Sequence, residues 1–461
     1  LPVSVVNEYD VVVVGGGPAG SVAAIAAARS GATVLLVEQN GYLGGALTAA
    51  GVGPQMTYHA GDTQVVRGIP EEIVQRLCAL GASPGHMADF VGYASSVTPF
   101  NPEGMKYVLE SMALDAGVTL LYHTVFVDCE ADSYEGGEIA SLRLLSKKGF
   151  MRVQAKVVVD CSADADVATS AGVPSCYGRE SDHLAQPMTM NLRVGNVDRD
   201  RLMDFVKSNR SDMLPSIPFD DLRIIPRSGI QGAYSIVKAA RGAGELSIDR
   251  DMVLCFETNT LGEYIVNMSR IIHRSAVDPI DLTYAEVEGR RQAWEIYAFL
   301  KKHISGFSES HIVSTGPNIG VRESRKIDGV YKLTADDLLS NTMFEDAIAM
   351  GGYPIDVHSP DGEETNHRFL KSGSWYSVPY RCLVTREVSN LIVAGRCVSA
   401  THEACAAIRV TPIVMAMGQA AGTAAAQAAL NKEPANSLDT SALRAQLRAD
   451  GVFLDEYPSE N

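Results

Sequence analysis

The first 38 residues constrain the fold of this chain more than any other segment. Residues 9–14, Tyr-Asp-Val-Val-Val-Val, form a β-branched run typical of a strand buried on both faces. The glycine-rich run GGGPAG (15–20) follows at once, and an alanine-rich segment then extends to Gly31. A second apolar run, 33–37, ends at Glu38. This order predicts a strand, a tight turn, a helix and a second strand, the opening unit of a doubly wound α/β domain.

Each part of this unit suits the binding of a dinucleotide. Gly15 permits the tight turn, Gly17 lets the backbone approach a pyrophosphate, and Gly20 lets the helix pack closely on the strand. The helix N-terminus directs N–H groups and a partial positive charge at the phosphates. Glu38 is placed to accept hydrogen bonds from a ribose and to repel a 2′-phosphate, so we do not expect NADP at this site.

The residues after Glu38 favour FAD over NAD. GYLGG (41–45) extends the glycine-rich surface just past the ribose-binding carboxylate. A flavin dinucleotide is longer than NAD and needs accessible backbone near its phosphates and ribityl chain. Glycines there meet that need.

A second anion-binding segment lies near the other end of the chain. Residues 390–396 read as a buried strand that ends at Gly395-Arg396. After a polar loop, Thr411 is expected to cap a helix in which Pro412 takes the first position. The uncharged run 413–430 then continues the helix. A helix N-terminus here stabilises negative charge on a reduced flavin by about 0.3–2 kcal/mol.

The run 413–430 also raises the question of a membrane span. It has 18 uncharged residues and contains the close-packing pattern Gly418-x-x-x-Gly422. It is nevertheless alanine-rich and includes Gln419 and Gln427, whereas a spanning helix needs about 20 strongly apolar residues. We therefore expect a buried helix and no membrane partner.

Charge and cysteine content narrow the class of protein further. With 39 Lys and Arg against 55 Asp and Glu, the net charge is −16 and no basic cluster occurs, so we expect no nucleic-acid partner. The eight cysteines show no CxxC pair and no zinc-like spacing, which predicts free thiols, no metal site and a cytoplasmic protein. The chain begins at Leu1, so a removed leader stays open, as does a homo-oligomeric state.

The sequence between residues 170 and 375 has a different pattern of polar and apolar residues. Residues 188–194, 252–256 and 264–268 show the mixed polarity of antiparallel strands. Thr283-x-x-Glu286 reads as a capping box that opens a helix, whose Val287, Trp294, Tyr297 and Leu300 are expected to face a core. We interpret this region as a cap whose face closes over a ligand.

The chain resembles a family of FAD-dependent oxidoreductases that share the nucleotide-binding domain of glutathione-reductase-like flavoproteins, a family that includes relatives of the heterodisulfide reductase flavin subunit. The matching segments are GGGPAG (15–20), GYLGG (41–45), VVVDCSADAD (157–166), VRESRKIDGVY (321–331), GGYPIDVH (351–358) and the block 395–422. The cysteine motifs of iron–sulfur proteins are absent from the sequence, so the resemblance does not extend to that electron-transfer role.

The resemblance implies an α/β fold, with a Rossmann-like FAD-binding domain and an inserted α+β cap that contains a mainly antiparallel sheet. Residues 1–170 and 376–435 would form the FAD-binding domain, 171–375 the cap, and 436–461 a C-terminal tail. The implied FAD-binding residues are Gly15, Gly17, Pro18, Ala19, Gly20, Glu38, Gln39, Gly44, Gly45, Ala46, Phe126, Ala163, Asp164, Gly395, Arg396, Pro412 and Ile413. Among these, Arg396 would donate to a phosphate or a flavin oxygen.

Candidate catalytic groups follow from the chemistry of a flavin, which itself takes a hydride at N5 and leaves a proton acceptor to the protein. His402 and His358 are the candidates for that acceptor, because histidine titrates near neutral pH. Glu403 is a candidate to orient His402. A carboxylate or enolate clamp is expected from among Arg322, Arg325, Arg381 and Arg409, with Arg409 preferred.

The expected function is hydride transfer between a small organic substrate and FAD, with the electrons passed to oxygen or another acceptor. A reductase or monooxygenase fed by NAD(P)H is the alternative. A tRNA-modifying flavoprotein and a flavin electron-transfer subunit are further readings.

Overall fold

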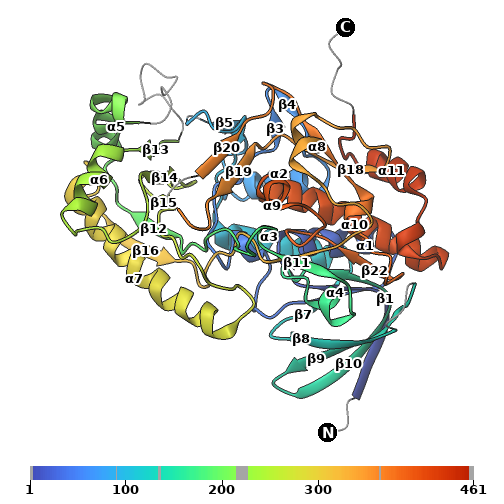
Figure 1. Ribbon diagram of the computed structural model, residues 1–461. Helices are drawn as coiled ribbons and strands as arrows, with labels where there is room; N and C mark the ends of the chain where they lie inside the picture. The colour runs from blue at the N-terminus through green and yellow to red at the C-terminus, as the bar shows by residue number, and fades with distance from the viewer. Residues whose placement is uncertain (1–3, 90, 133–135, 214–226, 363–364, 456–461) are drawn as a thin grey trace.

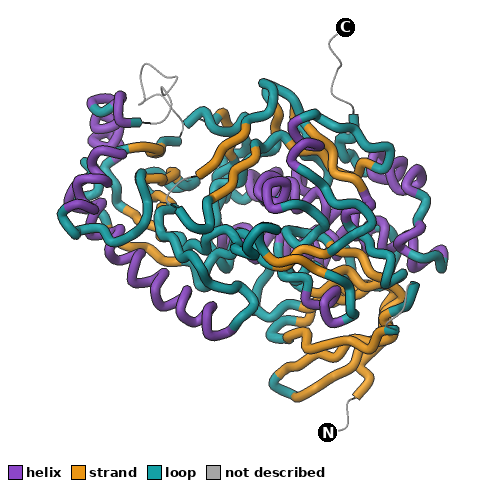
Figure 2. Tube along the Cα trace, in the orientation of Figure 1, coloured by secondary structure: helices purple, strands orange, loops and turns teal. Residues whose placement is uncertain are grey.

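The computed structural model describes residues 4–89, 91–132, 136–213, 227–362 and 365–455. Two regions are distinct in Figure 1. One contains a sheet of parallel strands packed against long helices, and the other contains a smaller sheet bordered by α5, α6 and α7. Figure 2 shows the strands of the larger sheet extending toward the N-terminus of the chain. The predicted α/β class is therefore confirmed.

The larger sheet has a parallel core with the order β7-β2-β1-β10-β22. The register of the pairing between β1 and β10 shifts between Val5 and Glu8. Val11, Val12 and Val13 are fully buried, as expected for a strand covered on both faces. The strands are β1 (Ser4–Val14), β2 (Val34–Val37), β7 (Thr119–Leu121), β10 (Gly149–Asp160) and β22 (Leu391–Val393).

An antiparallel ribbon extends this sheet. β8 (Val125–Ala131) pairs with β9 (Ile139–Ser146), and β9 pairs with the first part of β10. Along the same edge the end of β10 pairs instead with β22, and along its other edge β10 pairs with β1 from Met151 to Asp160. The start of β8 lies beside the end of β2, because the N–H of Thr124 donates to the carbonyl oxygen of Glu38 at 3.1 Å.

Two helices pack side by side against the parallel sheet. They are α1 (Pro18–Arg29) and α10 (Thr411–Asn431), which lie close together in Figure 1. Among the described helices, α10 is the one that is long and apolar enough to cross a membrane, yet 89% of its apolar window is buried inside the protein. The expectation of a buried core helix is confirmed.

The start of α10 differs from the prediction. Val410 is the N-cap, with extended backbone and no side-chain cap, and Thr411 is the first helical residue. The helix therefore begins one residue earlier than the position of Pro412 indicates. Without a capping side chain, its first N–H groups remain available to a ligand.

The smaller sheet is antiparallel, with the order β13-β14-β15-β12-β16, and we call the region built around it the cap. Its buried residues form a cluster that includes Met190, Tyr264, Phe299 and Phe307. Its elements are β12 (Leu192–Gly195), α5 (Arg199–Ser208), β13 (Gly229–Gly232), α6 (Tyr234–Gly242), β14 (Val253–Glu257), β15 (Tyr264–Val266), α7 (Pro279–His303) and β16 (His311–Thr315).

The prediction for the long cap helix was wrong in two respects. α7 begins four residues before Thr283, because Asp278 caps it by accepting hydrogen bonds from the N–H groups of Ile280 and Asp281. Trp294 and Val287 are also each 63% exposed, whereas Leu300 is buried as predicted. The buried face of the helix combines Ile296, Phe299 and Leu300 with small residues such as Gly289, on which a Cβ would lie only 2.9 Å from the Cβ of Met190.

Residues after the cap return to the core of the nucleotide-binding region. Leu333, Tyr376 and Leu447 all belong to the cluster of buried residues that contains α1, so part of the predicted cap and of the predicted tail packs with this core. The elements here are β17 (Arg325–Ile327), α8 (Ala335–Leu339), β18 (Ala347–Gly351), β19 (Ile355–His358), β20 (Thr365–Arg368), β21 (Tyr376–Pro379), α9 (His402–Ile408) and α11 (Thr440–Ala449).

The remaining elements complete the nucleotide-binding region and its edges. They are β3 (His59–Ala60), β4 (Thr63–Gln64), α2 (Ile69–Ala79), β5 (Met87–Ala88), β6 (Ser96–Val97), α3 (Pro102–Asp115), α4 (Asp166–Ser170) and β11 (Ser175–Tyr177). All eight cysteines are free thiols, as predicted.

Candidate functional site

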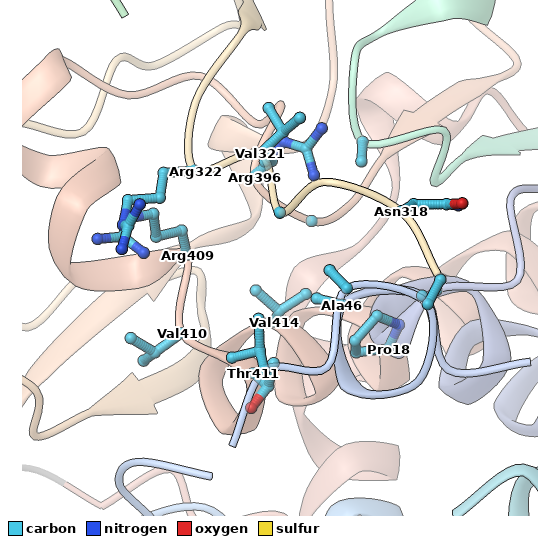
Figure 3. A pocket seen from close by; sticks show the side chains of 18 of the residues that line it. Pro18, Ala46, Asn318, Val321, Arg322, Arg396, Arg409, Val410, Thr411 and Val414 are labelled. Atoms are coloured by element: carbon cyan, nitrogen blue, oxygen red, sulfur yellow. The ribbon is translucent and has the colours of Figure 1, made fainter. Parts of the chain in front are cut away.

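A cavity of about 450 Å³ lies between the nucleotide-binding region and the cap. Residues from both regions line it, including Gly17 and Glu38 at one end and Leu254 and Arg322 at the other. Figure 3 shows Pro18 and Ala46 along one side of this pocket, and the guanidinium groups of Arg322 and Arg409 beside each other farther along. We call the two ends the glycine end and the cap end.

The glycines of the GGGPAG run divide into packing and ligand positions. Gly15 has a φ of +98°, and a Cβ on it would lie 2.3 Å from the carbonyl oxygen of Cys161. A Cβ on Gly20 would lie 1.8 Å from the carbonyl oxygen of Gly15, so this residue serves the close packing of helix and strand. A Cβ on Gly17, in contrast, would have no described atom within 4 Å. The space over Gly17 is therefore open for a ligand.

Glu38 lies at the end of β2 in the cavity lining, as the ribose prediction requires. Its Oε2 accepts the N–H of Gly16 at 2.7 Å, and its Oε1 accepts the N–H of Asn40 at 2.7 Å. Burial raises the pKa of this carboxyl, and the hydrogen bonds oppose that effect. A carboxylate has about four acceptor positions, so Oε2 keeps room for a ligand hydroxyl.

Both long helices begin at the cavity. Pro18 and Ala19 of α1 line it, as do Val410, Thr411 and Val414 around the start of α10. Unpaired N–H groups and a partial positive charge belong to each helix N-terminus. The site therefore offers two separate positions for the negative charges of a dinucleotide.

Most of the predicted cofactor residues lie in the cavity lining. Eleven of them do so: Gly15, Gly17, Pro18, Ala19, Glu38, Gln39, Gly45, Ala46, Phe126, Ala163 and Gly395. Arg396 does so too, although its guanidinium is also bound to Asp164 at 2.7 Å. Gly20, Gly44, Asp164, Pro412 and Ile413 are not among the described residues that line the cavity. They support it instead, Gly20 by packing and Asp164 by holding Arg396.

At the cap end, a hairpin gathers three ionisable side chains. Asp356 and His358 stand two residues apart on β19 and so share one face, and Asp356 is paired across the hairpin with His367 of β20. The Nε2 of His358 lies 3.4 Å from Asp356 Oδ2, and the Nδ1 of His367 lies 3.3 Å from Oδ1. Tyr353 donates to Asp356 Oδ2 at 3.2 Å.

The charges around this hairpin set its protonation. Burial, together with the positive charge of Arg322, lowers the pKa of His358 to about 3, so its imidazole is neutral at physiological pH. The contacts with His358, His367 and Arg409 hold the pKa of Asp356 well below its ordinary value despite burial. The cap end thus presents a neutral imidazole beside an ionised carboxylate.

Three arginines line the same end, and they carry most of its charge. Arg322 donates to Pro187 O at 2.8 Å and to the side chains of Thr189 and Asn267, all of them neutral. Arg409 lies 3.9 Å from Asp356 Oδ2. Arg250, from the loop before β14, also lines the cavity.

His402 is not among the described residues that line the cavity, which corrects its predicted place beside the ligand. It is 4% exposed, and its Nδ1 lies 2.7 Å from Oε2 of Glu323, which also binds Lys326. The same Oε2 accepts the N–H of Gln186 at 3.1 Å. The Gln186 side-chain oxygen in turn accepts from the backbone N–H of His358 and from the Arg409 guanidinium, each at 3.4 Å. His402 thus reaches the site through Glu323 and Gln186.

Two other predicted arginines are engaged elsewhere. Arg325 pairs with Asp166, and Arg381 pairs with Asp346 at 3.0 Å. Neither is among the described residues that line the cavity. Of the four candidates for an anion clamp, the structure brings only Arg322 and Arg409 together.

Several residues of the cap end were not predicted from the sequence. Asp356 is one of them, and its position two residues before the predicted His358 on the same strand was a sequence signal that could have identified it. Tyr93 binds His367 Nδ1 at 2.9 Å and is positioned by a loop whose N–H groups bind Asp89. Neither Tyr93 nor Arg250 belongs to a motif that marks a site, so no sequence signal pointed to them.

Comparison with known proteins agrees with this geometry. A family of proteins described as FAD dependent oxidoreductases matches residues 10–447, nearly the whole chain. The open space over Gly17, the carboxylate of Glu38 and the two helix N-termini fit the pyrophosphate and ribose of FAD.

Individual relatives are distant or match only in part. The chain is 29% identical over 188 residues to digeranylgeranylglycerophospholipid reductase 2 of Methanopyrus kandleri, covering 39% of this chain and 44% of the reductase. A segment of 42 residues is 62% identical to thiamine thiazole synthase of Aeropyrum pernix, covering 9% of this chain and 16% of the synthase. These matches span less than half of each curated relative.

A comparison with a solved structure covers nearly the whole chain, at low sequence identity. A geranylgeranyl bacteriochlorophyll reductase-like protein from Thermoplasma acidophilum is 14% identical, with a TM-score of 0.46, and the comparison covers 96% of this chain and 84% of that protein.

Proposed function

Because the chain belongs to the FAD-dependent oxidoreductase family, we propose that it transfers a hydride between a small organic substrate at the cap end and FAD bound at the glycine end. The observation that carries this proposal is the continuity of the cavity, which joins Gly17 and Glu38 to His358 in one space. FAD supplies the two-electron chemistry when it is bound. The electrons then pass to oxygen or to another acceptor.

The proposed proton acceptor is His358. Burial and the positive charge of Arg322 lower the pKa of its imidazole to about 3, so the ring is unprotonated before the substrate binds. A bound substrate that offsets the charge of Arg322 raises this pKa toward the range of an effective general base, and Asp356, 3.4 Å away, favours the protonated ring. The substrate gives up a hydride and a proton together. Bound FAD would supply the acceptor for the hydride, and the His358 imidazole would take the proton, so charge and atoms balance.

His402 is proposed as a positioning residue. Glu323 connects the His402 ring to the backbone N–H of Gln186, and the Gln186 side-chain oxygen accepts from the backbone N–H of His358 and from Arg409. Replacing His402 should therefore disturb orientation more than proton transfer. Its expected signature is a raised KM with a smaller change in kcat.

Anaerobic reduction of the purified flavoprotein tests the proposal. Oxidised flavin absorbs at about 450 nm, and this absorbance should be lost when a substrate from a panel of organic compounds reduces the cofactor. NADPH or NADH added without substrate should reduce the flavin slowly. Fast reduction by the nicotinamide alone would instead support the reductase or monooxygenase alternative. Protein that releases no FAD on denaturation would refute the cofactor assignment.

A further inference from the structure

The buried charge at the cap end is unbalanced. Three guanidinium groups, those of Arg250, Arg322 and Arg409, line it together with a single carboxylate, Asp356, while His358 is neutral. The positive charges of Arg409 and Arg250 both act on Arg322, so Arg322 lies within electrostatic range of each of the other two. Protein interiors do not keep unpaired charges without a partner or a ligand.

Arg250 is the most informative of the three. It is 4% exposed, its Nε has no hydrogen-bond partner, and no described residue forms an ion pair with its side chain. Asp251 and Asp356 act on it only at longer range. A side chain this deeply buried and this poorly paired indicates a missing anionic partner.

The neighbouring arginines lack strong pairing as well. Each hydrogen bond of Arg322 goes to a neutral oxygen, and Arg409 has an unpartnered Nε and approaches Asp356 only at 3.9 Å. The arginines come from three separate segments: a cap loop, the loop before β17, and the end of α9. The three guanidinium groups meet at one end of the cavity, and their positive charges are not balanced by carboxylates there.

We infer that the cap end binds a small organic acid with two carboxylates, and that Arg250, Arg322 and Arg409 are its anion-binding residues. This inference rests on the proposed function, because it names the substrate class for that same cavity. Three positive groups facing one carboxylate leave room for two negative charges. Guanidinium groups bind carboxylates through paired N–H donors.

The apolar side chains that line the cap end favour an organic ligand over an inorganic ion. Leu254 and Phe256 of β14 and Met252 beside them line this end and offer apolar contact to a short carbon chain. The polar donors here are side chains, among them Asn267, whereas phosphate groups are commonly cradled by rows of backbone N–H groups. A dicarboxylate therefore suits this end better than a phosphate.

Ligand titration of the FAD-loaded protein tests the inference. Succinate should perturb the flavin absorbance and raise the unfolding temperature more than propionate does, and the neutral succinamide should do neither. Inorganic phosphate should bind more weakly than succinate. Equal responses to succinate and succinamide, or a stronger response to phosphate, would overturn the dicarboxylate assignment. Because FAD is already bound in this experiment, such a failure leaves the proposed function intact.

Substitution of Arg250 separates a binding role from a structural one. Arg250→Met should weaken succinate binding at least about 30-fold, since loss of one buried charge partner has an effect of that order. Arg250→Lys should restore part of the affinity by restoring the charge. The ligand-free Arg250→Met protein should also unfold at a higher temperature, because an unpaired buried charge is removed.

The controls distinguish the remaining possibilities. Arg290→Met makes the same chemical change on the surface of α7, where Arg290 pairs with Glu286, and should leave succinate affinity unchanged. An Arg250→Met protein that unfolds at a lower temperature and binds succinate normally would show a structural role and refute the inference. An Arg250→Met protein that loses FAD would identify Arg250 as a cofactor residue and equally refute it.

Discussion

Gly422 of α10 faces the backbone of Ala23 of α1 so closely that a Cβ on Gly422 would lie 2.0 Å from the Ala23 carbonyl oxygen. The same relationship recurs one turn earlier, between Gly418 and Ala19, at 2.3 Å. Both helices begin at the cavity, so this crossing brings two helix N-termini to one cavity. The pattern that resembles a membrane-helix motif here serves a cofactor site.

Gly422→Ala is expected to destabilise the protein by about 3 kcal/mol or more, because the methyl group must force two buried backbones apart. Thermal unfolding monitored together with FAD release measures the effect. Gly242→Ala is the matched control, since a Cβ at the end of α6 has no described atom within 4 Å. Identical unfolding temperatures for wild type and Gly422→Ala would show that the crossing is more adaptable than this geometry implies.

The glycine end could be predicted from the sequence because its determinants are local. Gly15, Gly17, Gly20 and Glu38 lie within 24 consecutive residues, and the backbone turn fixes their relative positions. The antiparallel cap sheet was also predictable, since strand patterning is a short-range signal. These parts of the fold needed no knowledge of which distant segments meet.

The cap end could not be predicted to the same depth, because its contacts join distant segments. Glu403 was a candidate to orient its neighbour His402, yet the carboxylate partner of His402 is Glu323, 79 residues away in the sequence. Trp294 was expected in a core, whereas the buried face of α7 is formed by other residues, among them Ala293 and Phe299. Tertiary packing decides which face of a helix is buried, and a single sequence does not record it.

Gly17→Asp is expected to give folded protein without FAD. The new side chain enters open space, so the fold tolerates it, but its carboxylate meets the pyrophosphate and like charges in contact cost several kcal/mol. Circular dichroism and the flavin absorbance of the purified protein report the two effects separately. Gly20→Ala should fail differently, by unfolding, because its Cβ would lie 1.8 Å from the Gly15 carbonyl oxygen. A yellow Gly17→Asp protein would contradict the placement of the pyrophosphate.

His358→Asn is expected to slow flavin reduction by about 10²–10⁴-fold, the usual effect of losing a general base, while FAD stays bound. Anaerobic stopped-flow absorbance with whichever substrate reduces the wild-type flavin measures the rate. The control is His311→Asn on the exposed strand β16, which should reduce at the wild-type rate. Unchanged kinetics in His358→Asn would remove this residue from the mechanism.

His358 should also make the stability of the protein depend on pH. Its folded-state pKa of about 3, lowered by burial and by Arg322, is below the value of about 6.5 for an unfolded histidine. Between these values the unfolded chain binds the proton and the folded protein does not, so the contribution to stability is fully present above about pH 6.5 and is lost as pH falls toward 3.

One proton gives a slope of about 1.4 kcal/mol per pH unit, which sets the size of the predicted effect. Other histidines titrate in the same range, so the quantity to measure is the difference in unfolding free energy between wild type and His358→Asn, by urea denaturation from pH 6.5 to pH 4. In the wild-type protein the neighbouring Asp356 stays ionised above about pH 4, because its pKa is lowered, and in His358→Asn the contacts with His367 and Arg409 still lower that pKa. The difference should shrink as pH falls. A difference that is constant over this range would mean that the imidazole is protonated in the folded protein, and His358 could then not accept the proton in the proposed transfer.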